Sequence, residues 1–170
     1  DPWKLREFPF VPDFTESYFP FKSADHLSLL HALGIKIVIV HGSRPQVAEQ
    51  LALRNVDAHF HHSVRITDIA AMECSKEAAG ELRLDIEAAF SRGLPNTPMA
   101  GSRISVISGN FITAMPIGVV DGIDYQLTGL VRKVDSESIR MSLNSGKLVL
   151  LSPLGFSPTG QAFNLSFEDV

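Results

Sequence analysis

Apolar residues recur at intervals of three and four along four stretches of the chain, which cover residues 23–33, 45–52, 68–92 and 136–144. This spacing gathers apolar side chains on one face of a helix, so we expect four helices. Ser23 is the expected N-cap of the first helix, and Pro45 suits the first turn of the second. Thr67 or Asp68 is expected to cap the third helix.

Short runs rich in Val, Ile and Leu separate these stretches and predict strands. They cover residues 35–40, 59–66, 104–107, 111–116, 130–134, 147–151 and 162–165. Strands that alternate with helices favour a largely parallel α/β sheet. Two neighbouring runs meet at Ser108-Gly109-Asn110, which we expect to form the turn of an inserted β-hairpin. Residues 154–160 are expected to form a flexible loop.

The first 22 residues follow neither pattern, because they contain four prolines and seven aromatic residues. Prolines at this density exclude a long helix, so residues 1–22 are expected to form a separate extended arm. Residues 23–170 would form the domain proper. The aromatic side chains need a surface to pack on, and we expect the chain to associate as a homo-oligomer.

Composition narrows the classes of function. The chain of 170 residues has a net charge of −4, with 45% hydrophobic and 20% charged residues, which is ordinary for a globular domain. We expect no nucleic-acid partner and no membrane span, because there is neither a basic field nor an apolar run of sufficient length. No signal-peptide pattern opens the chain, which favours a cytoplasmic protein. Cys74 is the single cysteine, and we expect it to be a buried apolar side chain.

The first candidate for chemistry is the segment His41-Gly42-Ser43-Arg44, which follows a predicted strand and precedes a predicted helix. The N–H groups at a helix start suit an anion, and Arg44 would add a positive charge beside a carboxylate or a phosphate. The alternative is that Gly42 only makes the turn and that Arg44 is solvated.

A second candidate is Arg65, which lies between two β-branched apolar residues and points to the opposite face from both. It either forms a bidentate pair with a ligand carboxylate or pairs with Asp68 on the surface. Three histidines precede it: His59, His61 and His62. A metal site usually needs a third ligand with an oriented partner, and no further ligand is evident in the pattern, so we expect no metal.

The third candidate is the pair Asn164 and Glu168, which frame the end of the last predicted strand. An amide and a carboxylate at this place either hold a ligand or cap the start of a helix.

Six segments, in this order, resemble the N-acetylglutamate synthase and kinase group of the amino acid kinase family. They are HGSRPQ at 41–46, RITD at 65–68, NTPMAG at 96–101, SGNFI at 108–112, GVVDGIDY at 118–125 and LSPLGFSPTG at 151–160. The match extends from about His26 to Val170. It implies an amino acid kinase-like (carbamate kinase-like) three-layer α/β fold with a mainly parallel central sheet and a β-hairpin insertion. The chain would hold the N-terminal half of that fold only.

The resemblance is closer to the synthases than to the kinases, because Ser43 and Arg44 stand where kinases have further glycines. It implies substrate contacts for Gly42 near the substrate side chain, for Arg65 at the carboxylate and for Asn164. Glu168 stands where kinases carry a catalytic aspartate, which argues against phosphoryl transfer.

The function that the resemblance implies is the acetyl-CoA:L-glutamate N-acetyltransferase reaction at the first step of arginine biosynthesis. This chain would be its amino-acid-binding and regulatory domain, with glutamate or N-acetylglutamate as ligand and arginine as feedback effector. Acetyl-CoA would be a co-substrate of the full enzyme, and we expect no cofactor and no identifiable catalytic residue in this chain. The alternatives are an N-acetylglutamate kinase, whose phosphate cradle and lysine are not recognisable here, and a non-catalytic amino-acid sensor.

Overall fold

The computed structural model describes residues 19–92, 104–166 and 168–170. Its helices are α1 (Phe19–Ala32), α2 (Arg44–Leu53), α3 (Ile69–Ser91) and α4 (Ser136–Asn144). Within the described residues, no helix combines the length and the hydrophobicity that a membrane crossing requires.

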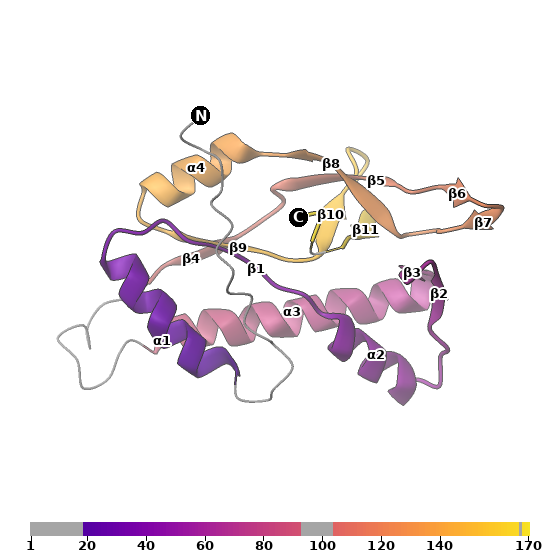
Figure 1. Ribbon diagram of the computed structural model, residues 1–170, viewed down its shortest axis with the longest axis horizontal. Coiled ribbons are helices and arrows are strands. Elements are labelled where there is room, and N and C mark those ends of the chain that lie inside the picture. The colour runs from indigo at the N-terminus through magenta and orange to yellow at the C-terminus, as the bar shows by residue number, and fades with distance from the viewer. Residues whose placement is uncertain (1–18, 93–103, 167) are drawn as a thin grey trace.

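A parallel sheet of three strands lies at the centre of the molecule. Its strands are β1 (Val38–Val40), β9 (Leu148–Leu151) and β4 (Val106–Ser108), in the order β1-β9-β4. Val149 of the middle strand pairs with Val38 on one side and with Ile107 on the other. Figure 1 shows α1 and α3 on one side of this sheet and α4 on the other. Every residue of β9 is buried, as expected of a strand covered on both faces.

A second, mixed sheet lies beside the first. Its strands are β5 (Ile112–Pro116), β8 (Gly129–Val134), β10 (Leu154–Phe156) and β11 (Ala162–Asn164), in the order β11-β10-β5-β8. β5 runs antiparallel to β8 and parallel to β10, and β10 runs antiparallel to β11. Gly129 lies in the tightest part, where a Cβ atom on this residue would come within 2.7 Å of the Cβ of Phe163. The two segments can approach this closely only because position 129 has no side chain.

Two short hairpins project from this framework. One consists of β2 (His59–His61) and β3 (Val64–Ile66), and the other of β6 (Val119–Val120) and β7 (Ile123–Asp124). Both two-residue turns have positive φ angles at both positions: 47° and 64° at His62 and Ser63, and 52° and 79° at Asp121 and Gly122. Two positive φ angles are the signature of a type I′ turn, whose twist matches that of the strands.

The apolar core is divided among three clusters. The first fills the space between the parallel sheet and helices α1 and α3, with Leu148, Leu150 and Phe90 at its centre. The second joins α2 to α3 through Leu51 and the fully buried Cys74, so the cysteine is a packed apolar side chain as expected. The third lies on the inner face of the mixed sheet around Ile112 and Phe163.

Several local predictions are confirmed. α4 has the predicted bounds, Pro45 lies in the first turn of α2, and Asp68 is the N-cap of α3. The Asp68 carboxylate accepts a hydrogen bond of 2.7 Å from the N–H of Ala71. These features depend on local sequence alone, which is why the pattern was sufficient.

Other local predictions are wrong. Ser23 does not cap the first helix, because α1 begins at Phe19 and contains Ser23; a proline at position 20 is tolerated in a first helical turn. The expected strand over 59–66 is folded into the β2–β3 hairpin, and the expected loop over 154–160 contains strand β10. The expected arm overlaps α1 at residues 19–22, and its first 18 residues lie outside the described part of the chain.

The predicted hairpin at Ser108-Gly109-Asn110 is also wrong. β4 and β5 flank this segment but belong to different sheets. Neither Gly109 nor Asn110 has the positive φ that a tight hairpin turn requires. The inserted hairpin is formed by β6 and β7 instead, farther along the chain.

Candidate ligand-binding site

A cavity of about 120 Å³ opens where α2 begins, next to the β2–β3 hairpin and the end of β11. Five of the six residues singled out from the sequence line it: Gly42, Ser43, Arg44, Arg65 and Asn164. The sixth, Glu168, is not among the lining residues, but its carboxylate lies 3.8 Å from the guanidinium of Arg44. The fold therefore brings together segments that are more than 100 residues apart in sequence, while the role of each residue stays a prediction.

The start of α2 forms one wall of this cavity. Ser43 is its N-cap and is 4% exposed, and its hydroxyl makes no capping hydrogen bond. The backbone carbonyl of Ser43 accepts a hydrogen bond of 2.9 Å from Val47, so the helix is formed from its first turn. The first turn of a helix carries N–H groups without partners inside the helix, and its dipole favours a negative charge. This wall therefore suits an anionic group.

Arg65 forms the opposite wall and comes from β3. Its guanidinium lies 5.0 Å from the centre of the Phe60 ring, which faces it across the hairpin. The Nη1 atom of Arg65 is buried and has no hydrogen-bond partner among the described residues. Burial lowers the pKa of Arg65, and the positive charge of Arg44 acts in the same direction. The predicted alternative partner, Asp68, is engaged as the cap of α3, so Arg65 presents an unsatisfied donor to an anion.

A network of hydroxyl and amide groups forms the floor of the cavity. The Oγ1 of Thr67 accepts a hydrogen bond of 3.1 Å from the side-chain amide of Asn164 and lies 2.9 Å from the Oγ1 of Thr128. The Oγ1 of Thr128 in turn accepts a hydrogen bond of 2.9 Å from the N–H of Thr67 and lies 2.7 Å from the carbonyl oxygen of Arg65. Thr67 is fully buried and Thr128 is 5% exposed. The network therefore fixes both Asn164 and the backbone of Arg65.

Glu168 lies at the rim of this site. Burial acts to raise the pKa of Glu168, but hydrogen bonds from the Ser166 hydroxyl and from the backbone, together with the charge of Arg44, hold it below its usual value. The carboxylate is therefore ionised at neutral pH. It partly offsets the charge of Arg44, although both side chains are more than half exposed and such pairs are weak.

Sequence reasoning missed Phe60 and Thr128 as parts of the site. Phe60 faces Arg65 only because the chain turns at His62-Ser63, and neither residue of that turn is a glycine. Thr128 lies 61 residues from its partner Thr67, in a stretch that carries no helix or strand periodicity. A signal for either residue would have required knowledge of which strands pair.

Comparison with known proteins agrees with this architecture. The model of the amino acid kinase family matches residues 22–170. The chain belongs to the amino acid kinase family. The expected α/β fold with a parallel central sheet and a hairpin insertion is thereby confirmed for the N-terminal portion of the family domain.

Curated relatives share high sequence identity with the chain. An amino-acid acetyltransferase from Ralstonia nicotianae is 70% identical over 144 residues, which cover 85% of this chain and 32% of the relative. An amino-acid acetyltransferase from Pseudomonas fluorescens is 54% identical over 144 residues, which cover 85% of this chain and 33% of the relative. The chain therefore spans about a third of the length of these relatives.

Two solved structures are similar to the chain in fold. The N-acetylglutamate synthase from Neisseria gonorrhoeae complexed with coenzyme A and L-arginine aligns with a TM-score of 0.78 at 35% identity, covering 85% of this chain and 34% of that one. The same synthase complexed with coenzyme A and N-acetyl-glutamate aligns with a TM-score of 0.74 at 35% identity, covering 85% and 32%.

Proposed function

We propose that this chain is the amino-acid-binding, kinase-like part of an N-acetylglutamate synthase. The whole protein would transfer the acetyl group of acetyl-CoA to the α-amino group of L-glutamate. The observation that carries the proposal is the buried Nη1 of Arg65, which has no partner among the described residues and belongs to a side chain lining a cavity bounded by the start of α2. The 70% identity to an amino-acid acetyltransferase supports the class of enzyme.

In this proposal Arg65 binds a carboxylate of glutamate or N-acetylglutamate through a charge-assisted hydrogen bond. Arg44 and the start of α2 add positive potential on the opposite wall. Asn164, held by Thr67, offers an amide to a polar group of the ligand. The residues of this chain bind and orient the amino acid. The general base that deprotonates the attacking amine belongs to the acetyltransferase part of the whole protein.

L-Arginine is the proposed feedback effector of the whole protein. Support comes from the synthase of Neisseria gonorrhoeae, which was solved in a complex with L-arginine. The kinase alternative has no comparable support, because the relatives described above are acetyltransferases and Glu168 replaces the aspartate expected of a kinase.

An assay of the full-length protein tests the enzymatic proposal. Release of free coenzyme A from acetyl-CoA is followed with a thiol reagent while the common amino acids are offered one at a time. We expect release that depends on L-glutamate and falls when L-arginine is added. Absence of glutamate-dependent release would reject the synthase, and turnover of ATP with N-acetylglutamate would favour the kinase.

Calorimetric titration of glutamate, N-acetylglutamate and arginine tests the site itself. Losing a hydrogen bond to a charged group costs about 1.5–3 kcal/mol, so Arg65→Ala should weaken ligand binding by roughly 10- to 150-fold. Arg65→Lys keeps the charge but not the planar fork and should bind with intermediate affinity. Arg132→Ala is the matched control, since Arg132 is exposed on β8 and does not line the cavity. Equal binding by wild type and Arg65→Ala would remove Arg65 from the site.

A further inference from the structure

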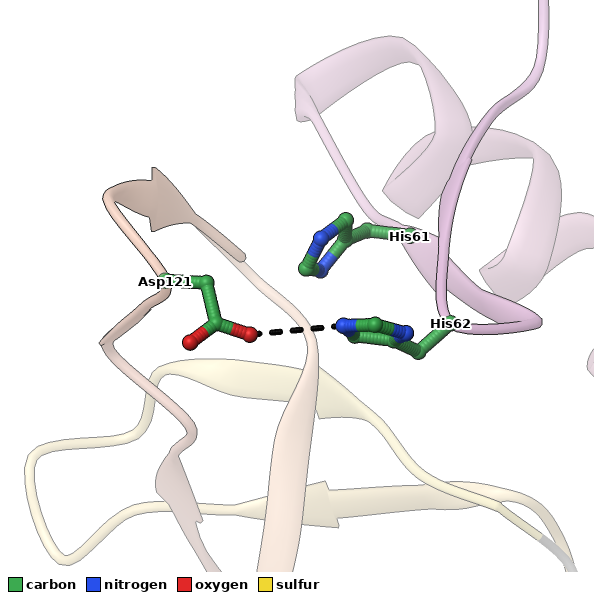
Figure 2. Close-up of side chains that lie close together, drawn as sticks. All are labelled: His61, His62 and Asp121. Atoms are coloured by element: carbon green, nitrogen blue, oxygen red, sulfur yellow. Dashed lines mark hydrogen bonds and ion pairs between the residues drawn. The ribbon is translucent and has the colours of Figure 1, made fainter.

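Three potential metal ligands meet where the two projecting hairpins approach each other. His61 ends β2, His62 opens the β2–β3 turn, and Asp121 opens the β6–β7 turn. Figure 2 shows both imidazoles and the carboxylate facing a common space. One ligand atom from each side chain lies within 4.8 Å of the others. Asp121 is the third ligand that the histidine pattern alone did not reveal.

The His61 ring is held by a buried neighbour outside the cluster. The hydroxyl of Tyr125, a residue that is 4% exposed, donates a hydrogen bond of 3.3 Å to the carbonyl oxygen of His61. With its only proton used there, the Tyr125 oxygen accepts the 2.7 Å hydrogen bond from Nδ1–H of His61. The neutral ring then carries its lone pair on Nε2. An oriented imidazole with a fixed tautomer is the arrangement in which histidine binds metals.

The other two ligands already interact with each other. Nε2 of His62 lies 3.3 Å from Oδ2 of Asp121, and the ring centroids of His61 and His62 are 4.0 Å apart. The left-handed φ angles of His62 and Asp121, 47° and 52°, place both at the tips of tight turns. The side chains are 71% and 66% exposed, so an ion can enter from solvent and the side chains can rotate to meet it.

We propose that His61, His62 and Asp121 bind one divalent transition-metal ion of the Zn²⁺ class, with water completing the coordination. Two imidazoles and one carboxylate are ligands of the type that Zn²⁺ and Co²⁺ accept. Bonds of about 2.0–2.2 Å require the three ligand atoms to draw closer than their present separation, which rotation of the exposed side chains provides. The ion takes the place of the proton shared by His62 and Asp121, and that proton passes to solvent.

The bound ion would link two elements that are otherwise separate hairpins. The β2–β3 hairpin also carries Phe60, Ser63 and Arg65, which line the ligand-binding cavity. Metal binding would therefore tie the cavity wall that holds Arg65 to the β6–β7 hairpin. This site lies outside the cavity, because none of its three ligands lines it.

The test uses the full-length protein, purified without a histidine tag and freed of metal with a chelator. It is titrated with Co²⁺, whose visible absorption reports ligand geometry, and the bound Co²⁺ is then displaced with Zn²⁺. The variants are His62→Asn and Asp121→Asn, because asparagine tolerates the left-handed backbone at both turns while removing the imidazole or the charge. His59→Ala is the matched control, an exposed histidine of the same hairpin outside the cluster.

We expect wild type and His59→Ala to bind one more equivalent of Co²⁺ than either asparagine variant, or to bind that equivalent at least tenfold more tightly. Zn²⁺ should also raise the unfolding temperature of wild type and of the control, but not that of the variants. The proposal is overturned if His62→Asn and Asp121→Asn bind Co²⁺ with the stoichiometry and affinity of wild type. It is equally overturned if His59→Ala loses the same equivalent.

Discussion

Replacing Gly129 with alanine should destabilise the mixed sheet and disturb the floor of the cavity. A Cβ atom at this position would lie 2.7 Å from the Cβ of Phe163 and 2.9 Å from the carbonyl oxygen of Met115. Both atoms are fixed to the backbone, so rotating a side chain cannot relieve the overlap. The backbone of β8 would have to move away from β11 and β5, and overpacking of this kind costs about 1–3 kcal/mol.

The backbone origin of the clash places the expected loss near the upper limit, at about 3 kcal/mol. In a chain of this length, each kcal/mol corresponds to about 2–4 °C, so the unfolding temperature should fall by roughly 6–12 °C. Because Gly129 follows Thr128 directly, the strand shift would also loosen the pairing of Thr128 with Asn164. We therefore expect weaker binding of the amino acid ligand as well as lower stability.

Thermal and urea unfolding followed by circular dichroism measure the effect, with Gly80→Ala as the control. Gly80 lies inside α3, and a Cβ atom there would meet no heavy atom within 4 Å. Alanine is the better helix former, so Gly80→Ala should stabilise the protein by up to about 1 kcal/mol. If Gly80→Ala behaves as expected and Gly129→Ala is as stable as wild type, the close-approach argument is refuted.

Four further predictions concern the site, helix capping, pH and assembly. Thr67→Val should cost about 1–3 kcal/mol in urea unfolding and weaken ligand binding, because it strands the Asn164 amide, whereas Thr67→Ser should retain binding. Asp68→Ala removes the α3 cap and should cost about 1 kcal/mol in the same assay, with Asp68→Asn close to wild type. Burial lowers the pKa of His41 below its usual 6.5, so the unfolded chain binds the proton first and stability should fall as the pH drops below about 6.5. The slope, at most about 1.4 kcal/mol per pH unit, should shrink in His41→Gln when urea midpoints are compared at about pH 7.5, 6.5 and 5.5. The 170-residue chain should associate on concentration, and a constant monomer mass in light scattering across a dilution series would contradict this.

Local sequence was sufficient for some elements and not for others. α4 and the cap of α3 follow from residues within one or two helical turns, and both were predicted correctly. β10 is a short segment between prolines and glycines, and it becomes a strand because β5 and β11 pair with its two edges. Ser108-Gly109-Asn110 has hairpin composition, yet the strands that flank it find partners in two different sheets. Tertiary pairing overrode local preference in both cases.

The candidate site shows the same division. Gly42, Ser43 and Arg44 were recognisable because a strand, a turn and a helix follow one another directly in sequence. The assembly of Arg65 with Asn164 followed from family resemblance and not from any pattern in the residues. The Thr67–Thr128 pair and the cluster of His61, His62 and Asp121 depend on contacts between segments about 60 residues apart, which no local pattern encodes.

The order of strands in the parallel sheet has a consequence for synthesis of the protein on the ribosome. β9 lies between β1 and β4, yet Val149 is made 111 residues after its partner Val38. At about 5–20 residues per second, β1 waits roughly 6–22 seconds for that neighbour. Among the described strands, β1 and β4 have no other partner in this sheet. The nascent chain therefore exposes two apolar β-branched segments during this interval, which makes the stretch before β9 emerges the natural point for chaperone binding.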